Sequence, residues 1–169
     1  MPARVTRENL RLGLEAYQHH LGARPRIALV NEQAYAAGLV PLYREAGFDG
    51  LIMDYDNPAA AHPEWPAATQ FLPQRALGPD GESIALIWSN TTLFQQLQRL
   101  AHGDIPLSAY AAFVRGRRGE GVRALCLYAS DAEIFDFRPG RFRTEEKLSS
   151  DGEWARLEQA FAAEWKTAR

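Results

Sequence analysis

Two short apolar runs, each leading to an acidic residue, constrain the fold of this chain more than any other feature. The first run ends at Val30, just before Glu32, and the second leads through Tyr128 to Asp131. Both are rich in aliphatic residues, as buried parallel strands are. Each carboxylate therefore follows the carboxyl end of a predicted strand, on the face where α/β folds build their sites. Two carboxylates on one face can serve as nucleophile and general acid/base in sugar transfer.

Predicted strands alternate with predicted helices along most of the chain. Strands are expected at 26–30, 50–53 and 123–128, and helices at 6–21, 34–46, 91–102, from 106 onward and from 151 onward. This alternation predicts an α/β fold with mainly parallel pairing, and residues 1–169 as a single α/β domain. Thr6 is the expected cap of the first helix, which carries a stripe made of Leu10, Leu14, Tyr17 and Leu21.

Two further segments carry local signals. Residues 74–77 and 83–88 flank the turn segment 78–82, which predicts a hairpin or an edge strand leading into a core strand. Residues 55–73 contain four prolines, and such a long proline-rich connection suggests a functional loop. Polar residues follow the ends of the predicted strands and are expected to line one rim: Asn31 and Glu32, Asp54, Ser89 and Asn90, and Ser130 and Asp131.

Composition excludes several classes of partner and site. The net charge is −2, from 19 basic and 21 acidic residues, which gives no reason to expect nucleic acid or an anionic membrane as a partner. Cys126 is the single cysteine, so an intramolecular disulfide and a cysteine-based zinc site are both impossible. No apolar stretch is long enough to span a bilayer and no secretory signal is recognisable, so a cytoplasmic location is expected.

Two segments resemble those of glycoside hydrolase family 57, which contains α-amylases, 4-α-glucanotransferases and branching enzymes. Segment 29–35 is similar to the family pattern Trp-x-Pro-Glu-x-Ala-Tyr, with Leu29 and Asn31 in place of its tryptophan and proline. Segment 131–135 is similar to Tyr-Asp-Ala-Glu-x-Phe-Gly, with Asp136 where glycine is common. The resemblance extends over roughly 9–142, and the two segments occur in the family's order.

The resemblance implies a retaining hydrolase or glycosyl transferase acting on α-glucans, with carbohydrate as its partner and neither a metal nor an organic cofactor. Glu32 would be the nucleophile and Asp131 the acid/base residue, with Glu133 supporting it. Absence of His-x-x-x-His and His-Glu-x-x-His segments argues against a metal-dependent polysaccharide deacetylase. The family's barrel is longer, so the expected fold is a partial (β/α)7-type barrel or an open, mainly parallel sheet flanked by helices. A non-catalytic carbohydrate-binding or partner subunit derived from such an enzyme is the alternative.

Each candidate site residue also has a plainer interpretation. Glu32 could be a carboxylate favoured at a helix N-terminus, and Asp131 could be a helix or turn cap. Of the two tryptophans, Trp65 in the proline-rich loop is the better stacking candidate, because Trp88 ends a strand and is more typical of a core. The predicted substrate-binding residues are Asp54, Trp65, Trp88, Asn90 and Glu133, while His62 lies in the loop and could reach the rim.

The family's early barrel strands have no counterpart in this sequence, and this predicts association with another polypeptide. A partial barrel leaves a sheet edge open, here near 26–30, and open edges invite pairing with another chain. We therefore expect self-association or a complementary N-terminal fragment. The alternative is a monomer, in which the helix at 6–21 and the C-terminal helix, with Trp154, Leu157, Phe161 and Trp165 on one face, cover the edges.

Overall fold

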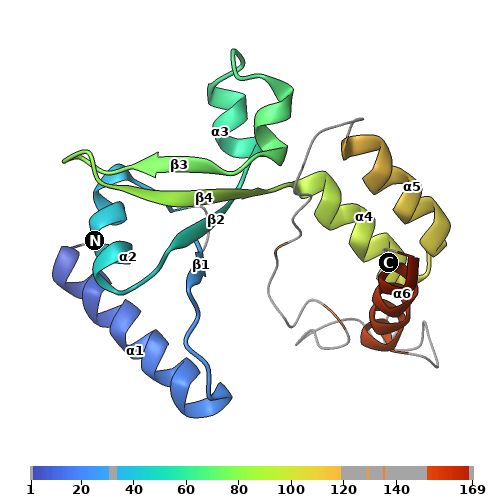
Figure 1. The fold of residues 1–169 in the computed structure, drawn as a ribbon, viewed down its shortest axis with the longest axis horizontal. Helices are drawn as coiled ribbons and strands as arrows, with labels where there is room; N and C mark the ends of the chain where they lie inside the picture. Colours follow the sequence, from blue (N-terminus) through green and yellow to red (C-terminus); the bar gives the residue numbers. More distant parts are fainter. Residues whose placement is uncertain (1, 31–33, 119–128, 130–134, 136–151, 168–169) are drawn as a thin grey trace. The chain divides into compact units, whose positions relative to one another are not determined.

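The structure is a computed structural model that describes residues 2–30, 34–118, 129, 135 and 152–167 (Figure 1). It divides into two compact units, Met1–Ser89 and Asn90–Arg169, each described here by itself. That division does not test the prediction of one α/β domain over 1–169, which stays a prediction. Glu32, Asp131 and Glu133 and the strand predicted at 123–128 lie outside the described residues.

The first unit is built on a four-stranded sheet in the order β1-β2-β4-β3. Its strands are β1 (Ile27–Leu29), β2 (Gly50–Asp54), β3 (Gln74–Leu77) and β4 (Ser83–Ser89). β1, β2 and β4 are parallel, and β3 joins β4 in an antiparallel hairpin. The predicted α/β class, the mainly parallel sheet and the hairpin are confirmed.

Five helical segments accompany this sheet: α1 (Ala3–Leu21), η2 (Ala37–Leu39), α2 (Val40–Glu45), α3 (Asp56–Ala61) and η3 (Ala67–Phe71). α1 and α2 contact one another and lie side by side in Figure 1. α1 begins after Pro2, so the prediction that Thr6 caps it is wrong. Residues 3–5 are all compatible with helix, so the helix extends one turn further toward the N-terminus, and Thr6 is buried inside it.

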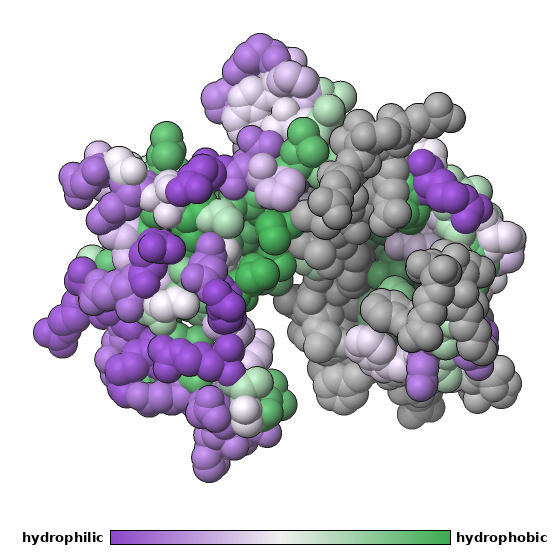
Figure 2. Space-filling model, in the orientation of Figure 1, coloured by the Kyte–Doolittle hydropathy of each residue, from purple (hydrophilic) through white to green (hydrophobic). Residues whose placement is uncertain are grey.

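The core of this unit lies on one face of the sheet, because side chains alternate between the two faces of a strand. Its buried members are Leu14, Val30, Val40, Phe48, Leu51, Met53, Tyr55, Ala76, Ile84, Leu86 and Trp88. The opposite face is open at β1, where Ile27 and Leu29 are 45% and 40% exposed. Figure 2 shows apolar surface on this unit between its hydrophilic groups. In the stripe predicted for α1, Leu14 is buried but Tyr17 and Leu21 are exposed.

The second unit contains α4 (Thr91–His102), α5 (Leu107–Arg118) and α6 (Glu153–Thr167). α4 begins at the Asn90 cap and ends at Gly103, which adopts the left-handed conformation, and its bounds match the helix predicted at 91–102. The buried cluster of this unit is Leu97, Leu100, Ala101, Phe135, Leu157 and Ala160. Of the stripe predicted for the last helix, Leu157 is buried, whereas Trp154 and Phe161 are exposed.

Candidate functional site

The carboxyl ends of β2 and β4 lie side by side in the first unit. Asp54 is the register partner of Ser89, the last residue of β4. The Tyr55 backbone N–H donates to the Ser89 carbonyl at 2.9 Å, and the Ser89 hydroxyl donates to the Met53 carbonyl at 3.2 Å. These bonds fix the point at which the chain leaves β2 for the proline-rich loop.

Asp54 contributes to that exit. Its Oδ1 accepts a hydrogen bond from the Asp56 backbone N–H at 2.9 Å. A carboxylate that bonds the backbone two residues on forms an Asx turn, which here leads directly into α3. The Asp54 side chain is half-buried, so this structural role accounts for at least one of its oxygens, and its predicted contact with substrate stays a prediction.

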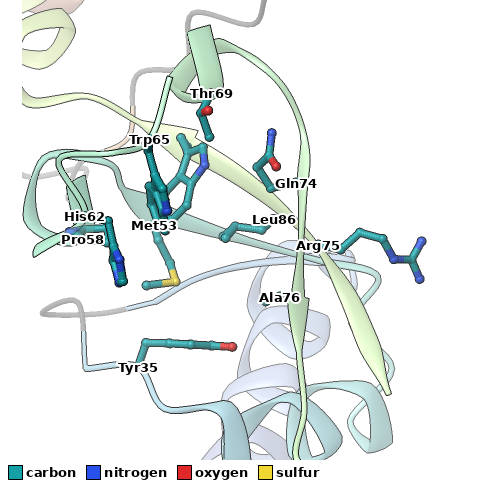
Figure 3. A pocket seen from close by; sticks show the side chains of 11 residues that line it. Tyr35, Met53, Pro58, His62, Trp65, Thr69, Gln74, Arg75, Ala76 and Leu86 are labelled. Atoms are coloured by element: carbon teal, nitrogen blue, oxygen red, sulfur yellow. The ribbon is translucent and has the colours of Figure 1, made fainter. Parts of the chain in front are cut away.

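A pocket of about 580 Å³ opens in the same unit (Figure 3). Ligand pockets commonly have this size and are lined by apolar and aromatic side chains. The proline-rich loop supplies His62 and Trp65, Tyr35 comes from the segment before η2, and the strands supply Met53 and Trp88. Figure 3 shows Tyr35 and Trp65 at different ends of the pocket, with Met53 and His62 between them.

Trp65 and Trp88, both predicted from the sequence, come together in this pocket at a ring-centroid distance of 6.1 Å. Tyr55 lies 6.2 Å from Trp65 and makes an edge-to-face contact with Trp88 at 5.6 Å. Trp88 is only 6% exposed, and its indole nitrogen has no hydrogen-bond partner in the described part of the chain. Trp88 is therefore mainly a core residue, whereas Trp65 is partly buried against that core.

A tight turn places His62 against Trp65. The Trp65 backbone N–H donates to the His62 carbonyl at 3.0 Å, and Pro63 occupies the second position of the turn, where its fixed φ is favoured. The two rings stack with centroids 4.7 Å apart and an interplanar angle of 4°. His62 Nδ1 lies 3.0 Å from Glu64 Oε1, and the carboxylate can only accept, so the imidazole donates. Hydrogen bonds from its own backbone and from His62 lower the pKa of Glu64.

Tyr35 and Met53 are pocket residues that the sequence reasoning did not select. Tyr35 belongs to the family-like segment that contains Glu32, which is the signal that could have identified it. Burial raises the pKa of its phenol, so the hydroxyl keeps its proton at neutral pH. The sequence predicts His62 only as a loop residue that could reach the rim; the turn His62-Pro63-Glu64-Trp65 is the local pattern that brings it to the tryptophan.

Asn90, predicted to bind substrate, acts as a helix cap in the second unit. Its side-chain oxygen accepts from the backbone N–H groups of Thr92 at 3.0 Å and Leu93 at 3.3 Å. The residue is 6% exposed. The cap explains why this side chain is buried, and a contact with substrate stays a prediction.

Neither a metal-binding cluster nor a membrane-spanning helix occurs in the described part of the chain. Within the described ranges, no group of three or more His, Cys, Asp or Glu residues could hold a metal ion. None of the helices among the described residues has the length and apolar character needed to cross a membrane.

Comparisons with known proteins give a family and a related fold. The model of glycosyl hydrolase family 57 matches residues 3–153. The solved structure of 4-alpha-glucanotransferase from Thermococcus litoralis is similar in fold, with a TM-score of 0.67 and 19% sequence identity. The match covers 92% of this chain but 23% of that chain, so the protein spans about a quarter of its length. No curated protein matches the sequence. Since the family model covers well over half of the chain, this protein belongs to glycosyl hydrolase family 57.

Proposed function

We propose that this chain is a retaining glycoside hydrolase or glycosyl transferase domain that acts on α-glucans. The aromatic pocket is the observation that carries this proposal. A pyranose ring presents C–H groups on its faces, and these pack well on the electron-rich face of an aromatic ring. Tyr35, His62 and Trp65 line a pocket of about 580 Å³, which suits a short oligosaccharide segment.

The proposed chemistry uses two carboxyl groups in two steps. Glu32 attacks the anomeric carbon while Asp131 gives its proton to the leaving oxygen, which produces a covalent glycosyl-enzyme. Asp131 then removes a proton from water or from a sugar hydroxyl, which attacks the intermediate and releases Glu32. Tyr35, three positions after Glu32 in the sequence, lines the aromatic pocket and supports this assignment. Retention requires the two carboxyl groups to lie about 5–5.5 Å apart.

Turnover of maltooligosaccharides by the chain and by variants of both carboxylates tests this mechanism. We expect Glu32→Gln and Asp131→Asn each to lower the rate by about 10³-fold or more, as removal of catalytic groups does. Asp80→Asn, in the exposed turn between β3 and β4, is the matched control and should keep full activity. A sugar fluoride needs no acid to leave, so Asp131→Asn should trap a glycosyl-enzyme that mass spectrometry detects. Full activity in either carboxylate variant would refute the mechanism.

A non-catalytic carbohydrate-binding or partner subunit is the second candidate, and the edge position of β1 in the described sheet favours it. β1 forms one end of the sheet, and its Ile27 and Leu29 are exposed on the face that carries no core. Parallel sheets are normally covered on both faces, so a second copy or a complementary polypeptide would bury these side chains. Saturable binding of maltooligosaccharides, without turnover and unchanged in Glu32→Gln, would favour this candidate.

Light scattering over a range of concentrations tests the assembly part of this candidate. We expect the chain to self-associate or to require a complementary fragment, and we expect Ile27→Lys to weaken that association. Arg4→Ala, on the exposed surface of α1, is a control. A monomer at high concentration that unfolds cooperatively would contradict the prediction.

A further inference from the structure

One face of Trp65 is partly covered by His62, a side chain of the same turn that lines the same pocket. His62 lies parallel to the indole, with an interplanar angle of 4° and a centroid separation of 4.7 Å. This is the offset geometry that stacked rings prefer. A pyranose stacked on the same face would need the space that the imidazole fills.

The contacts that hold the His62 side chain against Trp65 are weak enough for a sugar ring to replace them. The His62 and Glu64 side chains are 51% and 67% exposed, and exposed pairs of this kind contribute little to stability. The backbone of His62 is fixed by the turn to Trp65, so a rotation of the side chain alone moves the imidazole away from the indole. Such rotations of exposed side chains are fast.

We propose that His62 is a placeholder: its imidazole covers Trp65 in the free protein, and its side chain rotates away when a sugar ring stacks on the indole. The inference rests on the proposed α-glucan function of this pocket. It assigns His62 the role of a specificity-determining residue, because only a ligand that contacts Trp65 better than the imidazole does can displace it. Glu64 strengthens this selection by holding the imidazole in place.

If His62 binds the sugar directly, removal of its side chain changes the affinity in the opposite direction. If His62 instead contacts the sugar as part of an aromatic platform, its removal must weaken binding. If His62 is a placeholder, its removal frees the Trp65 face in advance and must strengthen binding. The sign of the change in affinity therefore decides between the two roles.

Calorimetric titration of the full chain with maltohexaose measures this change in affinity. We expect His62→Ala to lower the Kd by about two- to tenfold, the range that one aromatic contact is worth, and Glu64→Gln to lower it by a smaller factor. Trp65→Ala should raise the Kd, because the stacking surface itself is lost. His20→Ala, on the exposed end of α1 and away from the lining of the pocket, is the matched control and should leave the Kd unchanged. An unchanged or higher Kd for His62→Ala overturns the proposal.

A second measurement does not depend on affinity. Stacking on Trp65 shields the His62 ring protons, so their NMR signals should lie upfield in the free protein and move downfield on saturation with maltohexaose. Trp65→Ala should abolish the upfield shift without ligand. His62 signals that stay shielded in the saturated complex overturn the placeholder role while leaving sugar binding intact. Absence of maltohexaose binding by the unaltered chain overturns the proposed function itself, and the inference with it.

Discussion

Replacement of Trp88 by phenylalanine and by alanine should have very different effects on the stability of the first unit. Trp88 is 6% exposed in β4 and contacts both Tyr55 and Trp65 in the aromatic cluster. Its indole N–H has no hydrogen-bond partner among the described residues. The side chain therefore contributes through packing, while its one polar group is buried at a cost.

The magnitudes follow from these two properties. Trp88→Ala removes the whole ring system from a close-packed core and should cost about 3–5 kcal/mol of unfolding free energy. Trp88→Phe leaves a smaller cavity because the phenyl ring fills part of the space, and such a partial truncation costs roughly 1–2 kcal/mol. It also removes an unsatisfied donor, whose burial costs about 1–3 kcal/mol. The two terms oppose each other, so we expect Trp88→Phe to lie within about 1 kcal/mol of the unaltered chain.

Hydrogen exchange of peptides from β2 and β4 is the suitable assay, because it reports the opening of this unit separately from the second. We expect protection of both strands to be almost unchanged in Trp88→Phe and strongly reduced in Trp88→Ala. Equal losses in the two variants would refute the reasoning, because they would show that the indole N–H is satisfied or that the aromatic packing tolerates no smaller ring.

The remaining predictions concern the two ends of α4. Gly103 has φ +83°, and a Cβ there would lie 2.7 Å from Arg156 Nη1, so Gly103→Ala should cost about 1–2 kcal/mol and lower the Tm by about 2–8 °C in calorimetry; an unchanged Tm would argue against strain at this position. Asn90→Ala should cost about 1 kcal/mol in urea unfolding because two backbone donors lose their acceptor, whereas Asn90→Ser keeps a cap and should change little. Loss of maltohexaose binding in a stable Asn90→Ser variant would show that this side chain does more than cap the helix.

Local chemistry explains which elements could be predicted from the sequence. The strand predicted at 50–53 and the observed β2 differ by one residue, because an apolar run between glycine and aspartate has clear ends. Asn90 and Gly103 mark the ends of α4 because capping depends on a few neighbouring residues. In the proline-rich loop, α3 accommodates Pro58 in its first turn, where no intrahelical N–H bond is needed, so proline density alone did not reveal this helix.

The candidate site was predictable only in part, for a physical reason. Trp65 could be selected because it lies in the proline-rich loop, whereas Trp88 ends a strand. The contact between the two joins a loop to a strand and leaves no periodic signal. Stacking of His62 on Trp65 depends on side-chain rotamers within a turn, which residue types alone do not determine. The roles of Glu32 and Asp131 rest on their sequence motifs and stay predictions.

The arrangement of the sheet separates the two proposed activities of this chain. Met53 and Trp88 line the pocket and belong to the core, whereas Ile27 and Leu29 are exposed on β1. Side chains alternate along each strand, and the register pairs Leu29 with Ile52, the neighbour of Met53, so the exposed pair faces away from the pocket. A polypeptide that covers Ile27 and Leu29 would leave the aromatic pocket open. Assembly and sugar binding can therefore occur together, and loss of one in a variant need not entail loss of the other.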